Sequence, residues 1–332
     1  MIDYNILENM WIEHQRAAQK NKYKPGTVLN NLLRKFLVAG GLRIFKRHMH
    51  SLQPDGSKIL VKDNLNMESI NTLFRDNSVL AIRVPGFCSN EVARKLGNEA
   101  LKEYANWKLG GKIVTDMCYA GGSIPKEVAC NNKQSFIDYF LQNNEYVNSQ
   151  RELSNQEWPV DRLIEQLSEF WLGGAKLGSW LGQTFRPAIT RVMDVKHSYN
   201  QQSLKTGFIH TDNYSNINST SGLFSANIYL NIPEEGGELH IWNVNMSQDR
   251  SIRERISSKI FRLIQASLFN ITIQKQFREF LPEPYIIKPE LGDLIIFNTS
   301  RPHSVSPILK GKRVSIQLFI RKKGQGSLEV ES

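Results

Sequence analysis

Apolar residues follow two different periods along the chain, and the change lies near residue 188. Across residues 4–50 and 134–185 they recur at steps of three and four residues, which predicts mostly helical segments. Between these segments, the apolar run Val79–Val84 predicts a strand, and the pattern over residues 90–104 predicts a helix. Residues 52–66 are polar and contain glycine and proline, so we expect a connection there.

Beyond residue 188 the pattern predicts short strands separated by turns. Eight strands are expected, near residues 188–198, 206–212, 224–232, 237–243, 284–289, 293–297, 302–307 and 313–321. Such a set is typical of a jelly roll or a double-stranded β-helix. A basic amphipathic stretch at about 247–281 predicts a helical insertion between core strands, which is a candidate lid, a candidate oligomer surface or a packed helix. The predicted fold class is α+β, with a double-stranded β-helix core, N-terminal and flanking helices and this insertion.

Two short motifs in this region carry the candidate chemistry. His210 and Asp212 are two residues apart on an expected strand, so their side chains point to the same side. His303 on a later strand can complete a set of two histidines and one carboxylate. This set is the facial triad of non-haem Fe(II) oxygenases, which leaves coordination positions open. Arg313, which enters the next strand two residues before Ser315, can hold a carboxylate through two parallel hydrogen bonds.

Several motifs extend this pattern in a fixed order. They are His210-Thr211-Asp212, Tyr229-Leu230-Asn231, Gly236-Gly237-Glu238-Leu239, Gly292-Asp293-Leu294-Ile295-Ile296-Phe297, Pro302-His303-Ser304-Val305 and Gly311-Lys312-Arg313-Val314-Ser315. In the order and spacing of these motifs, residues 188–321 resemble the double-stranded β-helix core of the Fe(II)/2-oxoglutarate-dependent oxygenases, in the style of the prolyl-4-hydroxylase-like branch.

The resemblance implies a cosubstrate and a role for each site residue. The triad would bind Fe(II), and 2-oxoglutarate would chelate the metal beside the position that takes O2. The far carboxylate of 2-oxoglutarate would be held by Arg313, with Ser315 donating a hydroxyl group and Tyr229 as a second donor. Asn227 lies two residues before Tyr229 on the same strand face and could line the pocket.

Asp212 also bears on the reaction. In the related halogenases an alanine or glycine replaces this carboxylate, and chloride takes the vacant position. The carboxylate in this chain favours hydroxylation of an unactivated C–H bond, with release of succinate and CO2. Desaturation and ring closure, which also begin with hydrogen abstraction, remain open.

The sequence leaves the substrate class open between different hypotheses. In the first, the substrate is a small, charged molecule such as an amino-acid derivative or a natural-product intermediate. In style the chain is similar to natural-product tailoring hydroxylases, for instance those that act on cylindrospermopsin-like alkaloids. In the second, the basic N-terminal region docks a macromolecule, and the enzyme is a protein or nucleic-acid hydroxylase or demethylase. A third, a metal-free jelly-roll binding protein, is disfavoured by the intact triad.

Net charge bears on this choice. The chain has 42 Lys and Arg against 32 Asp and Glu, a formal net charge of +10, which favours anionic partners or simply keeps the protein in solution. The excess is densest between Arg16 and Lys62, where the aromatic residues are only Tyr23, Phe36 and Phe45. Single-stranded nucleic acids bind where aromatic side chains accompany basic ones. The sequence therefore favours a small-molecule substrate in a closed pocket over nucleic acid.

The remaining features concern location and organisation. The sequence has no run of 18 apolar residues and no secretory signal at its start, and we expect no membrane insertion. Its three cysteines, Cys88, Cys118 and Cys130, lack CxxC spacing and fit reduced thiols in a cytoplasmic protein. We divide the chain into an N-terminal helical extension at 1–75, an oxygenase domain at 76–322 and a C-terminal tail at 323–332.

Other candidate residues lie outside the motifs. His197 and His240 are placed on expected strands and are interpreted as structural, with a role in the substrate pocket as the alternative. Arg191 on the first strand could point inward to meet an anionic substrate. His48 and His50 are two residues apart in a basic segment, where they would not converge on a helix, so we expect a solvated basic surface.

Overall fold

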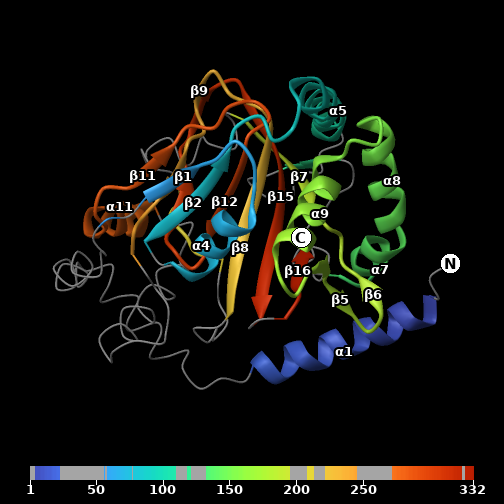
Figure 1. Cartoon of the computed structure of the whole chain (residues 1–332). Helices are drawn as coiled ribbons and strands as arrows, with labels where there is room; N and C mark the ends of the chain where they lie inside the picture. The colour runs from blue at the N-terminus through green and yellow to red at the C-terminus, as the bar shows by residue number, and fades with distance from the viewer. Residues whose placement is uncertain are drawn as a thin grey trace.

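The computed structural model describes residues 4–22, 56, 58–76, 78–109, 118–120, 132–194, 208–212, 221–244, 271–323 and 326–332, and these form a mixed α+β structure (Figure 1). The helices are α1 (Tyr4–Lys22), α4 (Met67–Arg75), α5 (Asn90–Leu109), α7 (Lys133–Leu141), α8 (Asn143–Leu153), α9 (Pro159–Phe170) and α11 (Ile271–Phe280). The strands are β1 (Lys58–Val61), β2 (Val79–Val84), β3 (Cys118–Ala120), β4 (Ala175–Leu177), β5 (Ser179–Trp180), β6 (Gln183–Thr184), β7 (Ile189–Asp194), β8 (Ser221–Asn231), β9 (Glu235–Gly236), β10 (Leu239–Ile241), β11 (Tyr285–Ile287), β12 (Leu294–Asn298), β13 (His303–Val305), β14 (Ile308–Lys310), β15 (Lys312–Lys323) and β16 (Leu328–Glu331).

The main sheet has nine strands, in the order β1-β2-β12-β8-β15-β16-β4, with β7 beside β15 and β3 beside β7. Strand β15 pairs antiparallel with β8, and its opposite edge pairs first with β7 and then with β16. A smaller sheet, β11-β10-β13, carries His303 at the start of β13. The remaining pairs are β14-β9 and β5-β6. Within the described ranges these are separate sheets, and no closed barrel is present.

The two faces of the main sheet differ because side chains alternate along each strand. On β15, Val314, Ile316 and Leu318 are fully buried in the hydrophobic core that α4, α5, α8 and α9 complete. Arg313 and Ser315 point to the opposite face, which we call the inner face. Figure 1 shows α5, α8 and α9 on one side of β8 and β15, and β11 and α11 on the other. The inner face also carries a smaller apolar cluster from β2, β10, β11 and β12.

A tight turn before β12 ties this strand to its neighbours. Gly292 has φ +82°, and a Cβ atom at this position would lie 2.2 Å from the carbonyl oxygen of Cys88. The Gly292 N–H donates to the Tyr229 carbonyl at 2.8 Å, and its own carbonyl accepts from the Cys88 N–H at 2.8 Å. Only glycine combines this backbone conformation with such a close approach.

Most of the expected strands are confirmed. Those beyond residue 188 correspond to β7, β8, β10, β11, β12, β13 and β15, and the strand and helix expected at 79–84 and 90–104 correspond to β2 and α5. The expected strand at 206–212 is described from residue 208 and pairs through a single bridge between His210 and His303. The insertion is helical over α11, and its residues 247–270 lie outside the described ranges.

Two expectations are corrected in part. Residues 134–185 are mostly helical, as expected, in α7, α8 and α9, but the helical pattern ends at Phe170, and β4, β5 and β6 follow. Gly174, with φ +66°, breaks the helical pattern, and the chain then pairs in parallel with β16 through β4. Residues 52–66 are more than a connection, because β1 pairs in parallel with β2.

The helical expectation over residues 4–50 is confirmed for α1, and residues 23–50, with His48 and His50, lie outside the described ranges. None of the helices in the described part of the chain is both long and apolar enough to cross a bilayer.

Candidate active site

A backbone bridge brings the two histidines of the expected triad together. The His210 N–H donates to the His303 carbonyl at 2.9 Å, and the His303 N–H donates to the His210 carbonyl at 2.8 Å. The Asp212 N–H donates to the Thr299 carbonyl at 3.2 Å, which fixes the other end of the short 208–212 segment. The His-x-Asp motif therefore lies directly beside the start of β13.

The side chains of these three residues converge. Asp212 Oδ2 lies 3.3 Å from His303 Nε2, and Asp212 Oδ1 lies 3.6 Å from His210 Nε2. One ligand atom from each residue lies within 4.8 Å of the others. The His303 side chain is 6% exposed, whereas those of His210 and Asp212 are 34% and 24% exposed, so a ligand can reach the centre from one side.

Both imidazole rings are oriented by backbone carbonyl groups. His210 Nδ1 lies 3.1 Å from the carbonyl oxygen of Phe208, and His303 Nδ1 lies 2.9 Å from that of Arg301. Because a carbonyl oxygen only accepts hydrogen bonds, Nδ1 carries the proton in each ring, and the Nε2 lone pair is available for a metal. The two histidines are thus in the tautomer that a metal site requires.

The protonation states also suit a divalent cation. Burial lowers the pKa of His210 to about 4, and the nearby charge of His303 acts in the same direction while Asp212 opposes it. Burial alone would raise the pKa of Asp212, but the charge and hydrogen bond of His303, together with His210, lower it to about 2. At neutral pH His210 is neutral and Asp212 is ionised, as metal ligands must be.

Arg313, the candidate cosubstrate residue, lies on the inner face of the main sheet. It is 4% exposed, and its Nη2 donates to Tyr229 Oη at 3.3 Å while the guanidinium lies over the tyrosine ring at 4.9 Å. Among the described residues, its Nε and Nη1 atoms have no hydrogen-bond partner. Burial lowers the pKa of Arg313, and a buried guanidinium requires a compensating anion. Ser315 is also buried and lies in register with Tyr229. These residues fit a carboxylate.

Asn227 lies on the inner face with Tyr229, but its side chain is hydrogen-bonded to Ser225. Its Nδ2 donates to Ser225 Oγ at 3.0 Å, and the same oxygen accepts from Gln317 Nε2 at 3.2 Å. Arg191 on β7 donates to Gln317 Oε1. The sequence reasoning did not single out Ser225 or Gln317. The alternation of β15, which places Gln317 four residues after Arg313, is the signal that could have found the latter.

Gln274 on α11 is a third residue that the sequence did not single out. Its Oε1 accepts from the Ile209 N–H at 2.9 Å, and its Nε2 donates to the Ile209 carbonyl at 3.2 Å. Both residues are 1% exposed. The side chain therefore clamps the backbone next to His210, as a neighbouring strand would.

His240 does not join the site. Its neighbours Leu239 and Ile241 point into the apolar cluster of the inner face, so the alternation of β10 directs His240 to the other side. Burial lowers the pKa of His240, and its ring contacts Trp242. These contacts favour the structural interpretation. His197 lies outside the described residues.

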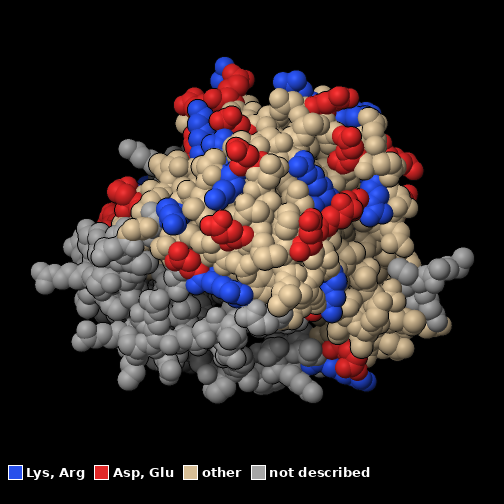
Figure 2. All heavy atoms as spheres, in the orientation of Figure 1, with Lys and Arg blue, Asp and Glu red and all other residues tan. Residues whose placement is uncertain are grey.

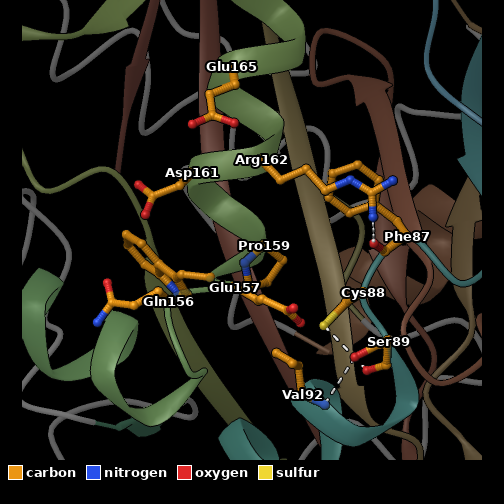
Figure 3. A pocket seen from close by; sticks show the side chains of 11 residues that line it. Phe87, Cys88, Ser89, Val92, Gln156, Glu157, Pro159, Asp161, Arg162 and Glu165 are labelled. Atoms are coloured by element: carbon orange, nitrogen blue, oxygen red, sulfur yellow. Dashed lines mark hydrogen bonds between the residues drawn. The ribbon is translucent and has the colours of Figure 1, made fainter.

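A pocket of about 380 Å³ lies apart from the triad, in the helix layer (Figure 3). The turn after β2, the start of α5 and the segment before α9 line it, and Figure 3 shows Arg162 reaching Phe87, whose carbonyl accepts from Nη1 at 2.7 Å. Burial raises the pKa of Cys88 in this pocket to about 12, so its thiol is no nucleophile at neutral pH. Neither the triad nor Arg313 is among the lining residues, and we do not assign the active site to this pocket.

The triad, the oriented imidazoles and the buried arginine define a class of protein, the non-haem iron oxygenases that use a 2-oxo acid. Residues 197–321 match the model of the 2OG-Fe(II) oxygenase superfamily. This part of the chain belongs to that superfamily, so the protein is an enzyme that depends on Fe(II) and 2-oxoglutarate. No curated protein matches the sequence.

The solved structures that match this chain share little sequence identity with it. An N-substituted L-amino acid dioxygenase from Burkholderia ambifaria AMMD is 13% identical, with a TM-score of 0.48, and the match covers 80% of this chain and 91% of that chain. A prolyl-4-hydroxylase from Pseudomonas putida is 14% identical, with a TM-score of 0.33 and coverage of 76% and 98%. A prolyl hydroxylase from Trichoplax adhaerens, in complex with a hypoxia inducible factor peptide fragment, is 13% identical, with a TM-score of 0.37 and coverage of 78% and 88%.

Proposed function

We propose that this protein hydroxylates an unactivated C–H bond of a small, charged molecule, with release of succinate and CO2. Two observations carry the proposal together: His210, Asp212 and His303 converge, and the buried Arg313 has two nitrogen atoms without partners among the described residues. Three metal ligands and one carboxylate-binding cation are what a chelated 2-oxo acid needs.

In this proposal each residue has a distinct role. His210 and His303 donate Nε2 lone pairs, and Asp212 neutralises one of the two charges of the metal. Arg313 holds the far carboxylate of 2-oxoglutarate through Nε and Nη1, while the Tyr229 hydroxyl supports Nη2 and can donate to the same carboxylate. When bound, Fe(II) and 2-oxoglutarate supply the oxidising chemistry with O2, and the protein provides position and exclusion of water.

Ser315 and Asn227 take supporting roles. Ser315 is buried two residues after Arg313 on the same face of β15, and its hydroxyl can donate to the cosubstrate carboxylate. Asn227 is hydrogen-bonded to Ser225 and lines the wall beside the cosubstrate rather than contacting Arg313. We infer that the inner face of the main sheet and the sheet containing β10 and β13 form the two walls of a double-stranded β-helix, because the triad joins them. We propose that residues 76–322 form the catalytic domain, with β1 paired to its main sheet and α4 packed against that sheet.

The carboxylate of Asp212 favours hydroxylation over halogenation, since it would hold the metal where a halide would otherwise bind. An amino-acid derivative or a natural-product intermediate fits a centre approached from one side. Figure 2 shows Lys and Arg interspersed with Asp and Glu over the described surface of the face in view. Several cations of the described residues are paired, as in Arg151–Asp161 and Arg321–Glu331. Such a mixed surface favours a small molecule over a polyanion.

The test uses two variants that distinguish loss of metal binding from loss of 2-oxoglutarate binding. Asp212→Ala is expected to lose Fe(II) binding and succinate formation. Arg313→Gln should keep metal affinity and lose about 100-fold in 2-oxoglutarate affinity, because it removes the cation from a desolvated ion pair. Arg321→Gln, on the same strand and face but paired with Glu331, is the matched control and should retain both affinities. Unchanged 2-oxoglutarate binding in Arg313→Gln would show that another residue holds the cosubstrate.

A further inference from the structure

The carbonyl group that orients the His303 ring belongs to a buried turn between β12 and β13. His303 Nδ1 lies 2.9 Å from the Arg301 carbonyl oxygen. The Arg301 N–H donates to the Asn298 carbonyl at 3.3 Å, and the Pro302 carbonyl accepts from the Trp242 N–H at 2.9 Å. Arg301 and His303 are only 2% and 4% exposed. Contacts within the protein, rather than solvent, therefore determine where the Arg301 carbonyl lies.

Asn243, just after β10, holds Arg301 by its side chain. In the pairing of β10 with β13, Ile241 stands opposite His303, and the hydrogen bond of the Trp242 N–H continues this register. Two residues beyond Ile241, Asn243 lies beside Arg301, and Arg301 Nη1 donates to Asn243 Oδ1 at 2.6 Å. Asn243 is 1% exposed. A hydrogen bond from a guanidinium cation is charge-assisted and stronger than one between neutral groups, so this contact fixes the Arg301 side chain.

The His303 ring has an acceptor at each of its two nitrogen atoms. Nδ1 faces the Arg301 carbonyl, and Nε2 lies 3.3 Å from Asp212 Oδ2. A neutral imidazole carries a proton on only one nitrogen atom, and only the tautomer protonated at Nδ1 offers the Nε2 lone pair to a metal. A carbonyl held beside Nδ1 favours that tautomer. If the carbonyl is displaced, Asp212 becomes the better acceptor and the proton moves to Nε2, which blocks metal binding.

We propose that Asn243 is a positioning residue for metal binding, which acts through Arg301 to hold His303 in its metal-binding tautomer. The inference rests on the proposed function, because it takes His303 as a metal ligand. A buried guanidinium N–H left without its acceptor is costly, so loss of the Asn243 oxygen makes the Arg301 side chain move towards another acceptor. The guanidinium and the carbonyl belong to one residue, so this movement displaces the carbonyl from His303 Nδ1.

The test measures the tautomer of His303 and the metal affinity in the same variants of the whole chain. Long-range nitrogen–proton NMR of the metal-free protein at alkaline pH shows which nitrogen of each imidazole is protonated, and the signal missing in His303→Gln assigns His303. Calorimetric titration with Mn(II) gives the affinity. Wild-type protein should show His303 protonated at Nδ1. Asn243→Leu should shift His303 towards the Nε2 form and lose about 10–100-fold in Mn(II) affinity.

Three further variants keep this test specific. Asn243→Asp retains an oxygen acceptor for Arg301 and should keep the wild-type tautomer. Asn243→Ser is too short to reach Arg301 Nη1 and should behave as Asn243→Leu does, which preserves the test if the leucine variant does not fold. Asn143→Leu removes another buried amide, which donates to the Thr184 carbonyl at 3.3 Å on α8. This matched control should keep the His303 tautomer and bind Mn(II) within about twofold of the wild type.

Other results would overturn the inference in distinguishable ways. If Asn243→Leu and Asn243→Ser keep both the Nδ1 form of His303 and the wild-type Mn(II) affinity, Asn243 contributes only to stability and the inference is wrong. If they lose Mn(II) affinity while His303 stays protonated at Nδ1, the proposed route through Arg301 is wrong, although the proposed function stands. If His303→Gln binds Mn(II) as tightly as wild-type protein, His303 is no metal ligand, and the site assignment of the proposed function fails together with the inference.

Discussion

Replacing Gln274 by leucine is expected to weaken metal binding although Gln274 is not a metal ligand. The amide of Gln274 makes two hydrogen bonds with the backbone of Ile209, at 2.9 and 3.2 Å, and Ile209 directly precedes His210. The clamp acts on a segment whose anchors also include the His210–His303 bridge and the bond from the Asp212 N–H to Thr299. Its loss should loosen the part of the chain that carries two of the three ligands.

The burial of Gln274 and Ile209 determines how much stability and metal affinity the variant should lose. Leucine is similar in size to glutamine but has no polar atoms, so Gln274→Leu leaves the N–H and the carbonyl of Ile209 without these partners. Each buried unsatisfied group costs about 1–3 kcal/mol, and outward movement of the segment can recover part of this by admitting water. We therefore expect a loss on the order of 2 kcal/mol in stability and a loss of about 10–100-fold in metal affinity, as for other residues that orient metal ligands.

Calorimetric titration with Mn(II) measures this loss of affinity, and hydrogen exchange of the Ile209 amide measures local opening. Gln274→Glu keeps an acceptor for the Ile209 N–H but no donor for its carbonyl, so its effect should be intermediate. Lys275→Gln changes an exposed residue of the same helix and should bind metal as the wild type does. A Gln274→Leu variant that has lower thermal stability but keeps its metal affinity within about twofold of the wild type would contradict this role of Gln274.

Two further predictions concern the turn before β12 and the thiol beside it. Gly292→Ala should destabilise the protein by about 2–4 kcal/mol, because its Cβ would meet Cys88 O at 2.2 Å and its φ is +82°. Urea titration measures the free energy of unfolding of this variant and of Gly182→Ala, where φ is +79° and the space around the Cβ is open. Gly182→Ala should be destabilised by only about 1 kcal/mol. Equal losses of stability in the two variants would show that the close approach to Cys88 is not the cause of the larger loss. For Cys88, burial raises the pKa to about 12, so the stability it contributes is present below pH 9.0 and is lost as the pH rises towards 12. Iodoacetamide should label Cys88 slowly in the native protein and quickly in urea, as mass spectrometry can show, and fast native labelling would contradict this.

The sequence predicted the parts of the fold that depend on local periodicity. On β15, Val314, Ile316 and Leu318 alternate with Arg313 and Ser315, and this pattern alone distinguishes the helix-facing side from the inner face. The strand β2 and the helix α5 were predictable for the same reason. The short strands β4, β5 and β6 were not, because their pairing depends on β16 and on turns rather than on a hydrophobic period.

The candidate site was likewise only partly predictable from the sequence. His210 and Asp212 form a local motif, and Arg313 follows His303 at short range, so these two pairs were predictable from their spacing. The contacts of Gln274 with Ile209 and of Arg191 with Gln317 join residues 65 and 126 positions apart. No local pattern marks such partners, since a glutamine on an amphipathic helix has the same propensity whether it meets solvent or a backbone.

The inner face divides into an apolar half and a polar half, with the triad at the border. Phe297 on β12 belongs to the apolar cluster and packs edge-on against the His303 ring, with centroids 4.8 Å apart. On β8 and β15 the corresponding positions carry Ser225 and Gln317, which are buried and hydrogen-bonded to each other. A face buried for stability alone would gain more from apolar residues, because buried polar groups contribute only when every partner is in place. Gln317 lies on the same strand and face as Arg313, and a site that binds a metal ion and a carboxylate needs polar groups there.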